Sequence, residues 1–155
     1  MVEKQNKNLT RTTLLPTYTR HKLENGSTYL MPKGFPIDGF ESGLRYVARE
    51  NDVFVATYPK CGTTWMQSIV YLILRNGEPI TSDIKLSSIF PHLEEVGKEF
   101  VANVAAMTND SNYRLIKTHL PFDLTPFSEK SKYIYVTRNP VSILSYSFTF
   151  KTEYH

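Results

Sequence analysis

The chain has 155 residues, a length that favours a single domain. Apolar residues make up 41% and charged residues 21%, a globular composition that argues against wholesale disorder. The 18 Lys and Arg against 15 Asp and Glu give a net charge of +3, too small to indicate nucleic-acid binding by itself. Such a charge suits a site for an anionic small molecule, and we expect no nucleic-acid partner.

Cysteine usage and hydropathy bear on where the protein resides. The single cysteine, Cys61, excludes an internal disulfide framework and fits a reducing compartment. The longest apolar run, Ile69 to Leu74, is far shorter than the roughly 20 residues that cross a bilayer. The polar first residues are not followed by the apolar core of a signal peptide. We therefore expect a cytoplasmic protein with no membrane partner.

The first part of the chain is rich in proline and glycine, which predicts an irregular lead-in over residues 1–45. A short helix is expected within Gly39 to Arg49. The remaining residues, 46–155, are expected to form the N-terminal part of one domain.

Strand and helix patterns alternate after this lead-in. Residues 52–58 are nearly all apolar, which is typical of a strand buried on both faces of a parallel sheet. The other predicted elements are, in order, a helix over 63–76, helices over 82–88 and 92–106, strands over 113–118 and 132–137, and a helix that opens at Asn139-Pro140. Strands separated by helices predict an α/β fold with a central parallel sheet in three layers, similar to a P-loop fold.

The loop between the first of these strands and its helix carries an anion-binding pattern. A helix N-terminus attracts anions, Gly62 allows close backbone approach, Thr63 and Thr64 add hydroxyl donors, and Lys60 adds a positive charge. The usual ATP or GTP loop places its Lys after the second Gly, whereas Lys60 precedes the only Gly here. The pattern predicts phosphate binding but disfavours an ordinary ATPase.

Two further residues follow predicted strands. His119 lies at the carboxyl end of a strand, where ligands bind in open α/β sheets, and imidazole can accept a proton from an attacking hydroxyl. Arg138 follows the last strand and can hold a phosphate through two parallel hydrogen bonds. The remaining histidines match no motif and are expected to be surface or packing residues: His21, His92 and His155.

These segments together resemble one family. Residues 57–65, T-Y-P-K-C-G-T-T-W, look like the 5′-phosphosulfate loop T-Y-P-K-S-G-T-T-W of the cytosolic sulfotransferases, with Cys61 in the Ser place. K-T-H-L-P at 117–121 is similar to the segment that carries the family's catalytic base, and Y-V-T-R-N-P at 135–140 to its 3′-phosphate segment. The resemblance covers about residues 30–150, roughly the N-terminal half of a typical member. The C-terminal side of the fold is absent, so we expect a truncated chain.

The resemblance implies a sulfotransferase that moves the sulfuryl group of 3′-phosphoadenosine 5′-phosphosulfate (PAPS) in line to a hydroxyl or amine of a small acceptor, leaving adenosine 3′,5′-bisphosphate. It implies that His119 is the general base, that Lys60 and Lys117 stabilise the developing charge, and that no metal takes part. The implied donor-binding residues are Lys60, Cys61, Gly62, Thr63, Thr64, Trp65, Arg138 and Ser145.

The chain departs from the family pattern after Arg138. Tyr146 stands where the family has the Ser that holds the 3′-phosphate, and Ser145 and Ser147 flank it. Both serines stay open for this role, with Ser145 favoured.

Two other functions stay open. The chain could be a non-catalytic, truncated nucleotide-binding remnant of the same family. A nucleotide kinase using ATP is a weaker alternative, disfavoured by the displaced Lys60 and by the lack of an Asp for Mg²⁺ after the later strands. The acceptor is not specified by the sequence; Phe35, Phe90 and Phe122 are candidates for an apolar acceptor pocket. A homodimer is expected only for a full-length form.

Overall fold

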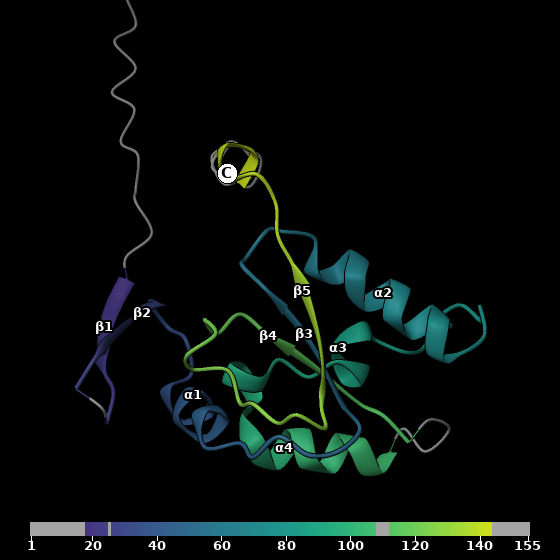
Figure 1. Ribbon diagram of the computed structural model, residues 1–155, viewed down its shortest axis with the longest axis horizontal. Coiled ribbons are helices and arrows are strands. Elements are labelled where there is room, and N and C mark those ends of the chain that lie inside the picture. Colours follow the sequence, from purple (N-terminus) through teal and green to yellow (C-terminus); the bar gives the residue numbers. More distant parts are fainter. Residues whose placement is uncertain (1–17, 25, 108–111, 144–155) are drawn as a thin grey trace, which may run out of the picture. The chain divides into compact units, whose positions relative to one another are not determined.

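The computed structural model describes residues 18–24, 26–107 and 112–143 (Figure 1). Its elements are, in chain order, β1 (Tyr18–Lys22), β2 (Thr28–Pro32), α1 (Ile37–Leu44), β3 (Asp52–Thr57), α2 (Thr63–Leu74), α3 (Leu86–Ile89), α4 (Leu93–Met107), β4 (Arg114–Thr118) and β5 (Lys132–Val136). The chain divides into two compact units between Phe35 and Pro36. This division lies before the end of the expected lead-in at residue 45.

The first unit contains a β-hairpin, where an irregular segment was predicted. Strands β1 and β2 pair antiparallel, from Tyr18 opposite Pro32 to Lys22 opposite Thr28. Gly26 adopts a left-handed backbone conformation, with φ of 82°, and its N–H donates to the carbonyl of Leu23 to close the turn. The Asn-Gly dipeptide at 25–26 is a strong hairpin signal that the sequence prediction overlooked.

The second unit is built on a parallel sheet of order β4-β3-β5, as the alternation of strands and helices predicted. Strand β3 is central, and all six of its residues are buried. It pairs with β4 from Asp52 opposite Arg114 and with β5 from Val53 opposite Lys132. The predicted α/β fold with a central parallel sheet is confirmed.

Helices cover both faces of this sheet (Figure 1). Successive β3 side chains point to opposite faces. Val53 and Val55 pack with Val70 of α2 and Ile89 of α3 in one apolar cluster. On the other face, the Phe54 ring stacks on Tyr133 and makes an edge contact with Tyr46, which follows α1. The result is the expected three-layer arrangement.

Helices α1 and α4 approach each other closely because α1 carries glycine at the contact. A Cβ atom added at Gly39 would lie 2.2 Å from the carbonyl oxygen of Glu95, and one at Gly43 would lie 2.7 Å from that of Leu93. Helix α1 was predicted over 39–49 but begins and ends earlier. Helix α4 confirms the prediction for 92–106, with a kink at Gly97, where φ is 78°.

The other predicted helices differ mainly in length. The predicted helix over 82–88 is only the single turn α3, Leu86–Ile89. Helix α2 begins at Thr63 as predicted and ends at Leu74, and Asn76 and Gly77 follow with positive φ. Pro140 begins the last helical turn described, as predicted from proline's preference for the first helical position.

A buried polar cluster joins the amino ends of the two strands β3 and β4. Asp52 is fully buried and accepts hydrogen bonds from the Tyr46 hydroxyl and from Nη1 of Arg114, each at 2.8 Å. The same Nη1 donates to the Tyr46 oxygen at 2.9 Å. Burial raises the pKa of Tyr46 to about 12, so this hydroxyl stays protonated and can donate. The cluster links the segment after α1 to the amino edge of the sheet. It lies away from the opposite edge, where the strands have their carboxyl ends.

Candidate functional site

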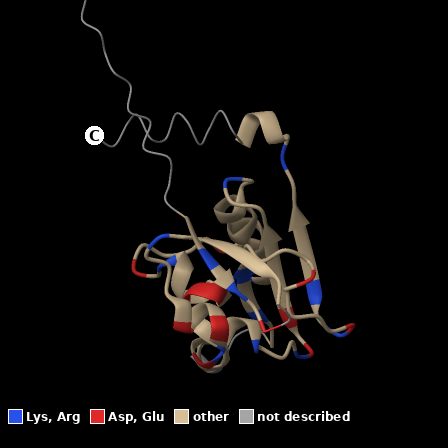
Figure 2. Cartoon of the chain, turned by 90° about the vertical axis from the view of Figure 1, so that its left-hand side faces the viewer, with Lys and Arg blue, Asp and Glu red and all other residues tan. Residues whose placement is uncertain are grey.

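The three parallel strands end at one edge of the sheet. Ala56 lies opposite Thr118, and Thr57 lies opposite Val136, so the segments that follow leave the sheet side by side. These segments carry the sequence-predicted residues Lys60, His119 and Arg138. In Figure 2, basic residues appear in the loop after β3 and just beyond β5, while acidic residues gather on α1 and α4. The carboxyl edge is therefore the candidate site.

The loop from β3 to α2 has the backbone of an anion cradle. Lys60 and Gly62 both have positive φ, 68° and 101°, and Gly62 is the N-cap of α2. No side chain caps this helix start, and a Cβ added at Gly62 would meet no atom within 4 Å. The start of α2 is therefore uncapped by any side chain and open beside Gly62, which suits an anion site.

The side chains of this loop divide into buried and exposed ones. Cys61 is buried with a free thiol, and its N–H donates to the carbonyl of Tyr58 at 3.2 Å, so the turn itself uses that N–H. Lys60, Thr64 and Trp65 are exposed, and Trp65 is 68% exposed. Their predicted contacts with a donor nucleotide remain predictions.

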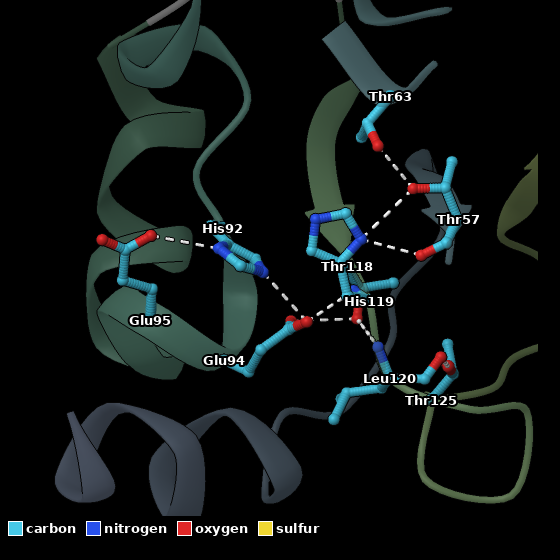
Figure 3. A network of polar contacts seen from close by, with 9 residues as sticks. All are labelled: Thr57, Thr63, His92, Glu94, Glu95, Thr118, His119, Leu120 and Thr125. Carbon is cyan, nitrogen blue, oxygen red and sulfur yellow. Dashed lines mark hydrogen bonds and ion pairs between the residues drawn. The ribbon is translucent and has the colours of Figure 1, made fainter. Parts of the chain in front are cut away.

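Thr57 joins the cradle to the predicted base (Figure 3). Its hydroxyl oxygen lies 2.6 Å from the hydroxyl oxygen of Thr63 at the start of α2. The same oxygen lies 3.2 Å from Nδ1 of His119, and the Thr57 carbonyl oxygen lies 2.7 Å from that nitrogen. One buried residue at the end of β3 therefore contacts both parts of the candidate site.

The contacts of His119 define its chemistry. A carbonyl oxygen can only accept, so its contact with Nδ1 requires the proton on Nδ1 and leaves the lone pair on Nε2. Burial lowers the pKa of His119, and the nearby charges of Lys117 and His92 lower it further, against the opposing effects of the Thr57 carbonyl and Glu94. The imidazole is therefore neutral at pH 7, in the form that accepts a proton.

Glu94 is a central residue of this site that sequence reasoning did not select. Its Oε1 accepts a short hydrogen bond from the backbone N–H of His119, and its Oε2 accepts from the Thr118 hydroxyl at 3.0 Å. Oε1 also lies 3.0 Å from Nε2 of His92 as an ion-pair contact. No motif of the sequence singles out Glu94; the signals that could have selected it were its place in the first turn of a predicted helix and in the segment 90–94, which resembles a pocket segment of the family.

His92, predicted to be a surface or packing residue, belongs to the same network. Its Nδ1 lies 3.0 Å from Oε2 of Glu95, and its ring makes an edge contact with the ring of His119, with centroids 4.9 Å apart. His92 also forms a single parallel bridge with Lys117 of β4. His92 is therefore a packing residue, one of the two roles predicted for it, and chain pairing outside the regular strands brings it to the sheet edge.

Lys117 lies one residue before the end of β4 and is partly buried. Burial lowers the pKa of its ammonium group, and the carboxylates of Glu94 and Glu95 partly offset this. Its predicted role toward a sulfuryl group stays a prediction.

Arg138 is exposed two residues beyond β5. The side-chain oxygen of Asn139 accepts from the N–H of Val141 at 2.9 Å and so caps the helical turn that begins at Pro140. Ser145 and Ser147 lie outside the described residues.

The predicted pocket phenylalanines differ in exposure and in the unit to which they belong. Phe90 is 1% exposed and belongs to the apolar core, which removes it from an acceptor pocket. Phe122 is 87% exposed, and Phe35 belongs to the other compact unit.

The described residues contain neither a metal-binding cluster nor a membrane-spanning helix. Within 18–24, 26–107 and 112–143, no three His, Cys, Asp or Glu side chains come together in a group that could hold a metal ion. None of the helices in these ranges is long and apolar enough to cross a membrane.

A parallel α/β sheet with a glycine-containing loop between its central strand and the following helix defines a P-loop-like fold class. The family model for the sulfotransferase domain matches residues 50–155, and the chain therefore belongs to this family. It is 37% identical over 123 residues to human sulfotransferase 1E1, covering 76% of this chain and 41% of that protein. It is 39% identical over 137 residues to mouse sulfotransferase 2B1, covering 79% and 39% respectively. The chain thus spans about two fifths of the length of these curated relatives.

Solved structures agree on the fold. The mouse sulfotransferase SULT7A1 complexed with PAP aligns with a TM-score of 0.54 and 24% identity, covering 84% of this chain and 43% of that one. Retinol dehydratase in complex with retinol and PAP aligns with a TM-score of 0.58 and 21% identity, covering 86% and 48%. At these identities the likeness supports the fold alone.

Proposed function

We propose that this chain is the donor-binding and base-carrying part of a sulfotransferase that uses PAPS and a small acceptor with a hydroxyl or amine. The observation that carries the proposal is the Thr57 contact with both Thr63 and His119, which brings the predicted cradle and the predicted base together. Both of the similar solved structures are complexes with PAP, adenosine 3′,5′-bisphosphate, which is the product that PAPS would leave.

The donor would bind at the carboxyl edge of the sheet. The uncapped start of α2 and the hydroxyls of Thr63 and Thr64 suit the 5′-phosphate, and Lys60 suits the oxygen that bridges phosphorus and sulfur. Arg138, beyond the neighbouring strand β5, suits the 3′-phosphate. Lys60 and the start of α2 follow β3, and Arg138 follows the neighbouring strand β5. Two separate groups of anion-binding residues suit a ligand with two phosphates.

The transfer itself would need no metal ion. Nε2 of His119 takes the proton of the acceptor hydroxyl or amine while the acceptor atom forms its bond to sulfur. The bond between sulfur and the bridging oxygen breaks, and that oxygen leaves with its electron pair on adenosine 3′,5′-bisphosphate. Lys60 and Lys117 stabilise the negative charge that develops on the leaving and transferring oxygens.

Calorimetric titration of the 155-residue chain with adenosine 3′,5′-bisphosphate tests donor binding, with ATP and Mg²⁺ as the control ligand. Lys60→Ala and Arg138→Ala should each weaken binding about 10- to 100-fold, the range for a lost charge-assisted hydrogen bond. Lys130→Ala is the matched control, because Lys130 is an exposed cation near Glu50 that precedes β5 at the opposite edge of the sheet. A folded chain that binds the bisphosphate no better than ATP would refute the donor assignment.

A transfer assay separates catalysis from binding. Labelled PAPS is offered with a phenol, a steroid alcohol, an amine and a lipid alcohol, since the acceptor is unknown. His119→Ala should abolish transfer while bisphosphate affinity stays within about twofold, because the base touches the acceptor rather than the phosphates. Bisphosphate binding without transfer to any acceptor would instead support the nucleotide-binding remnant.

A further inference from the structure

We propose that Glu94 is a positioning residue that holds the turn carrying His119, so that Nδ1 stays bonded to Thr57 and Nε2 stays directed to the acceptor; this inference rests on the proposed function. Glu94 does not contact Nε2 of His119 in any described interaction. It acts instead on the backbone of that residue and on the residue before it.

Glu94 forms two hydrogen bonds to the end of β4, one from each carboxylate oxygen. Oε1 accepts from the His119 N–H, and Oε2 accepts from the Thr118 hydroxyl, so both carboxylate oxygens are used by adjacent residues (Figure 3). The Thr118 oxygen in turn accepts from the N–H of Leu120 at 3.1 Å. The chain from Thr118 to Leu120 is therefore fixed at three successive residues just where the strand ends.

Glu94 itself is held rigidly. Only 3% of it is exposed, and it lies in the first turn of α4, before the break at Gly97. The helix start is fixed to the sheet, because the N–H of Lys117 donates to the carbonyl of Pro91 at 3.0 Å and His92 bridges to Lys117. Nε2 of His92 adds a third contact to the carboxylate.

The charge on Glu94 is maintained by its partners. Burial alone would raise the pKa of Glu94, but contacts with His92 and the His119 N–H outweigh this and lower it. A buried carboxylate is costly unless it is hydrogen-bonded on both oxygens, and here it is. A leucine or methionine would fill the same space at a lower desolvation cost. We therefore infer that the two carboxylate oxygens of Glu94 serve as hydrogen-bond acceptors that orient the end of β4.

The test uses Glu94→Gln in the 155-residue chain. The glutamine amide has one acceptor oxygen, whereas the two carboxylate oxygens accept from two donors. One of the two hydrogen bonds to the end of β4 is therefore lost. We expect kcat for sulfuryl transfer to fall about 10-fold while KM for PAPS and the bisphosphate affinity stay within twofold, as for a misplaced catalytic group. Glu99→Gln on the same helix is the matched control, because its carboxylate accepts from Ser42 and does not contact the strand end.

A second readout does not depend on activity. Nitrogen-15 NMR of the imidazoles distinguishes the Nδ1–H from the Nε2–H tautomer. Wild type should show His119 with the proton on Nδ1, and Glu94→Gln should show a mixture of both tautomers. The groups facing this ring are the Thr57 carbonyl, Lys117, His92 and Glu94, and the first three are unchanged in the variant.

The outcomes are separable. A folded Glu94→Gln chain with wild-type kcat, or one with the wild-type tautomer, overturns the proposal, as does a bisphosphate affinity that falls as much as kcat. If wild type transfers no sulfuryl group, the proposed function fails, and the tautomer comparison alone decides on Glu94. If Glu94→Gln does not fold, Thr118→Val removes one of the two hydrogen bonds to Glu94. This variant should lower kcat about threefold and give a mixture of the two His119 tautomers. An unchanged kcat and an unchanged tautomer would overturn the proposal.

Discussion

The contact between Thr57 and Thr63 allows a quantitative test of how the cradle is joined to the sheet. The two hydroxyl oxygens are 2.6 Å apart, and both residues are buried, with 3% and 8% exposed. Thr57→Val keeps the shape and the backbone carbonyl that His119 uses but removes the hydroxyl. A buried hydroxyl left without its partner costs about 1–3 kcal/mol of unfolding free energy, and Thr63→Val should cost a similar amount.

The two substitutions should not be additive. Removing both hydroxyls leaves no unpaired partner at this contact, so the double variant should be about 1 kcal/mol more stable than the sum of the single changes predicts. Urea denaturation of wild type, both single variants and the double variant measures this coupling. Thr64→Val is the matched control on the next residue of α2, because Thr64 is exposed, and it should change stability by less than about 0.5 kcal/mol. Additivity within about 0.3 kcal/mol would refute the contact.

Three further outcomes are expected. Gly39→Ala should destabilise the fold by about 1–3 kcal/mol in urea denaturation, because its Cβ would meet the Glu95 carbonyl; an unchanged midpoint would contradict the α1–α4 contact. Gly62→Ala should cost about 1 kcal/mol, since φ is 101° there, and calorimetry should show weaker bisphosphate binding. Stability should fall as pH drops below 6.5, since the folded pKa of His119 lies below that value, and His119→Asn should flatten this dependence.

The pH dependence has a second region at lower pH. The pKa of Glu94 is below its usual 4.5 in the folded chain, so the stability it contributes is present above pH 4.5 and is lost as pH falls through the folded value. Denaturation of Glu94→Gln between pH 3 and about 5 should show a weaker pH dependence than wild type. Parallel curves for the two chains would show that Glu94 titrates normally.

Much of the second unit could be predicted from the sequence because its signals are local. The buried run 52–57, the glycine and threonines that begin α2, and the proline that begins the last helical turn each specify their own element. The placement of Lys60, His119 and Arg138 after three strands also followed, since parallel strands end at one sheet edge.

What could not be predicted depends on contacts between distant segments. Glu94 is only one of two adjacent glutamates in the sequence, and nothing local distinguishes it from Glu95. Pairing of residues 91–92 with β4 selects it, because that pairing turns one carboxylate toward His119 and leaves the other 57% exposed. Phe90 was misassigned for the same reason, since its burial follows from the packing of α3 on the sheet.

The segment around α1 has a practical consequence for how this domain can be shortened. The family match begins at residue 50, but Phe40, fully buried, and Tyr46, which bonds Asp52 and Arg114, both precede it. A chain trimmed to residues 50–155 would keep every proposed site residue yet uncover the α4 surface that α1 contacts and leave Asp52 with one partner fewer. Expression trials guided by family boundaries alone should therefore give aggregating protein, whereas a start at Pro36 retains α1, Phe40 and Tyr46.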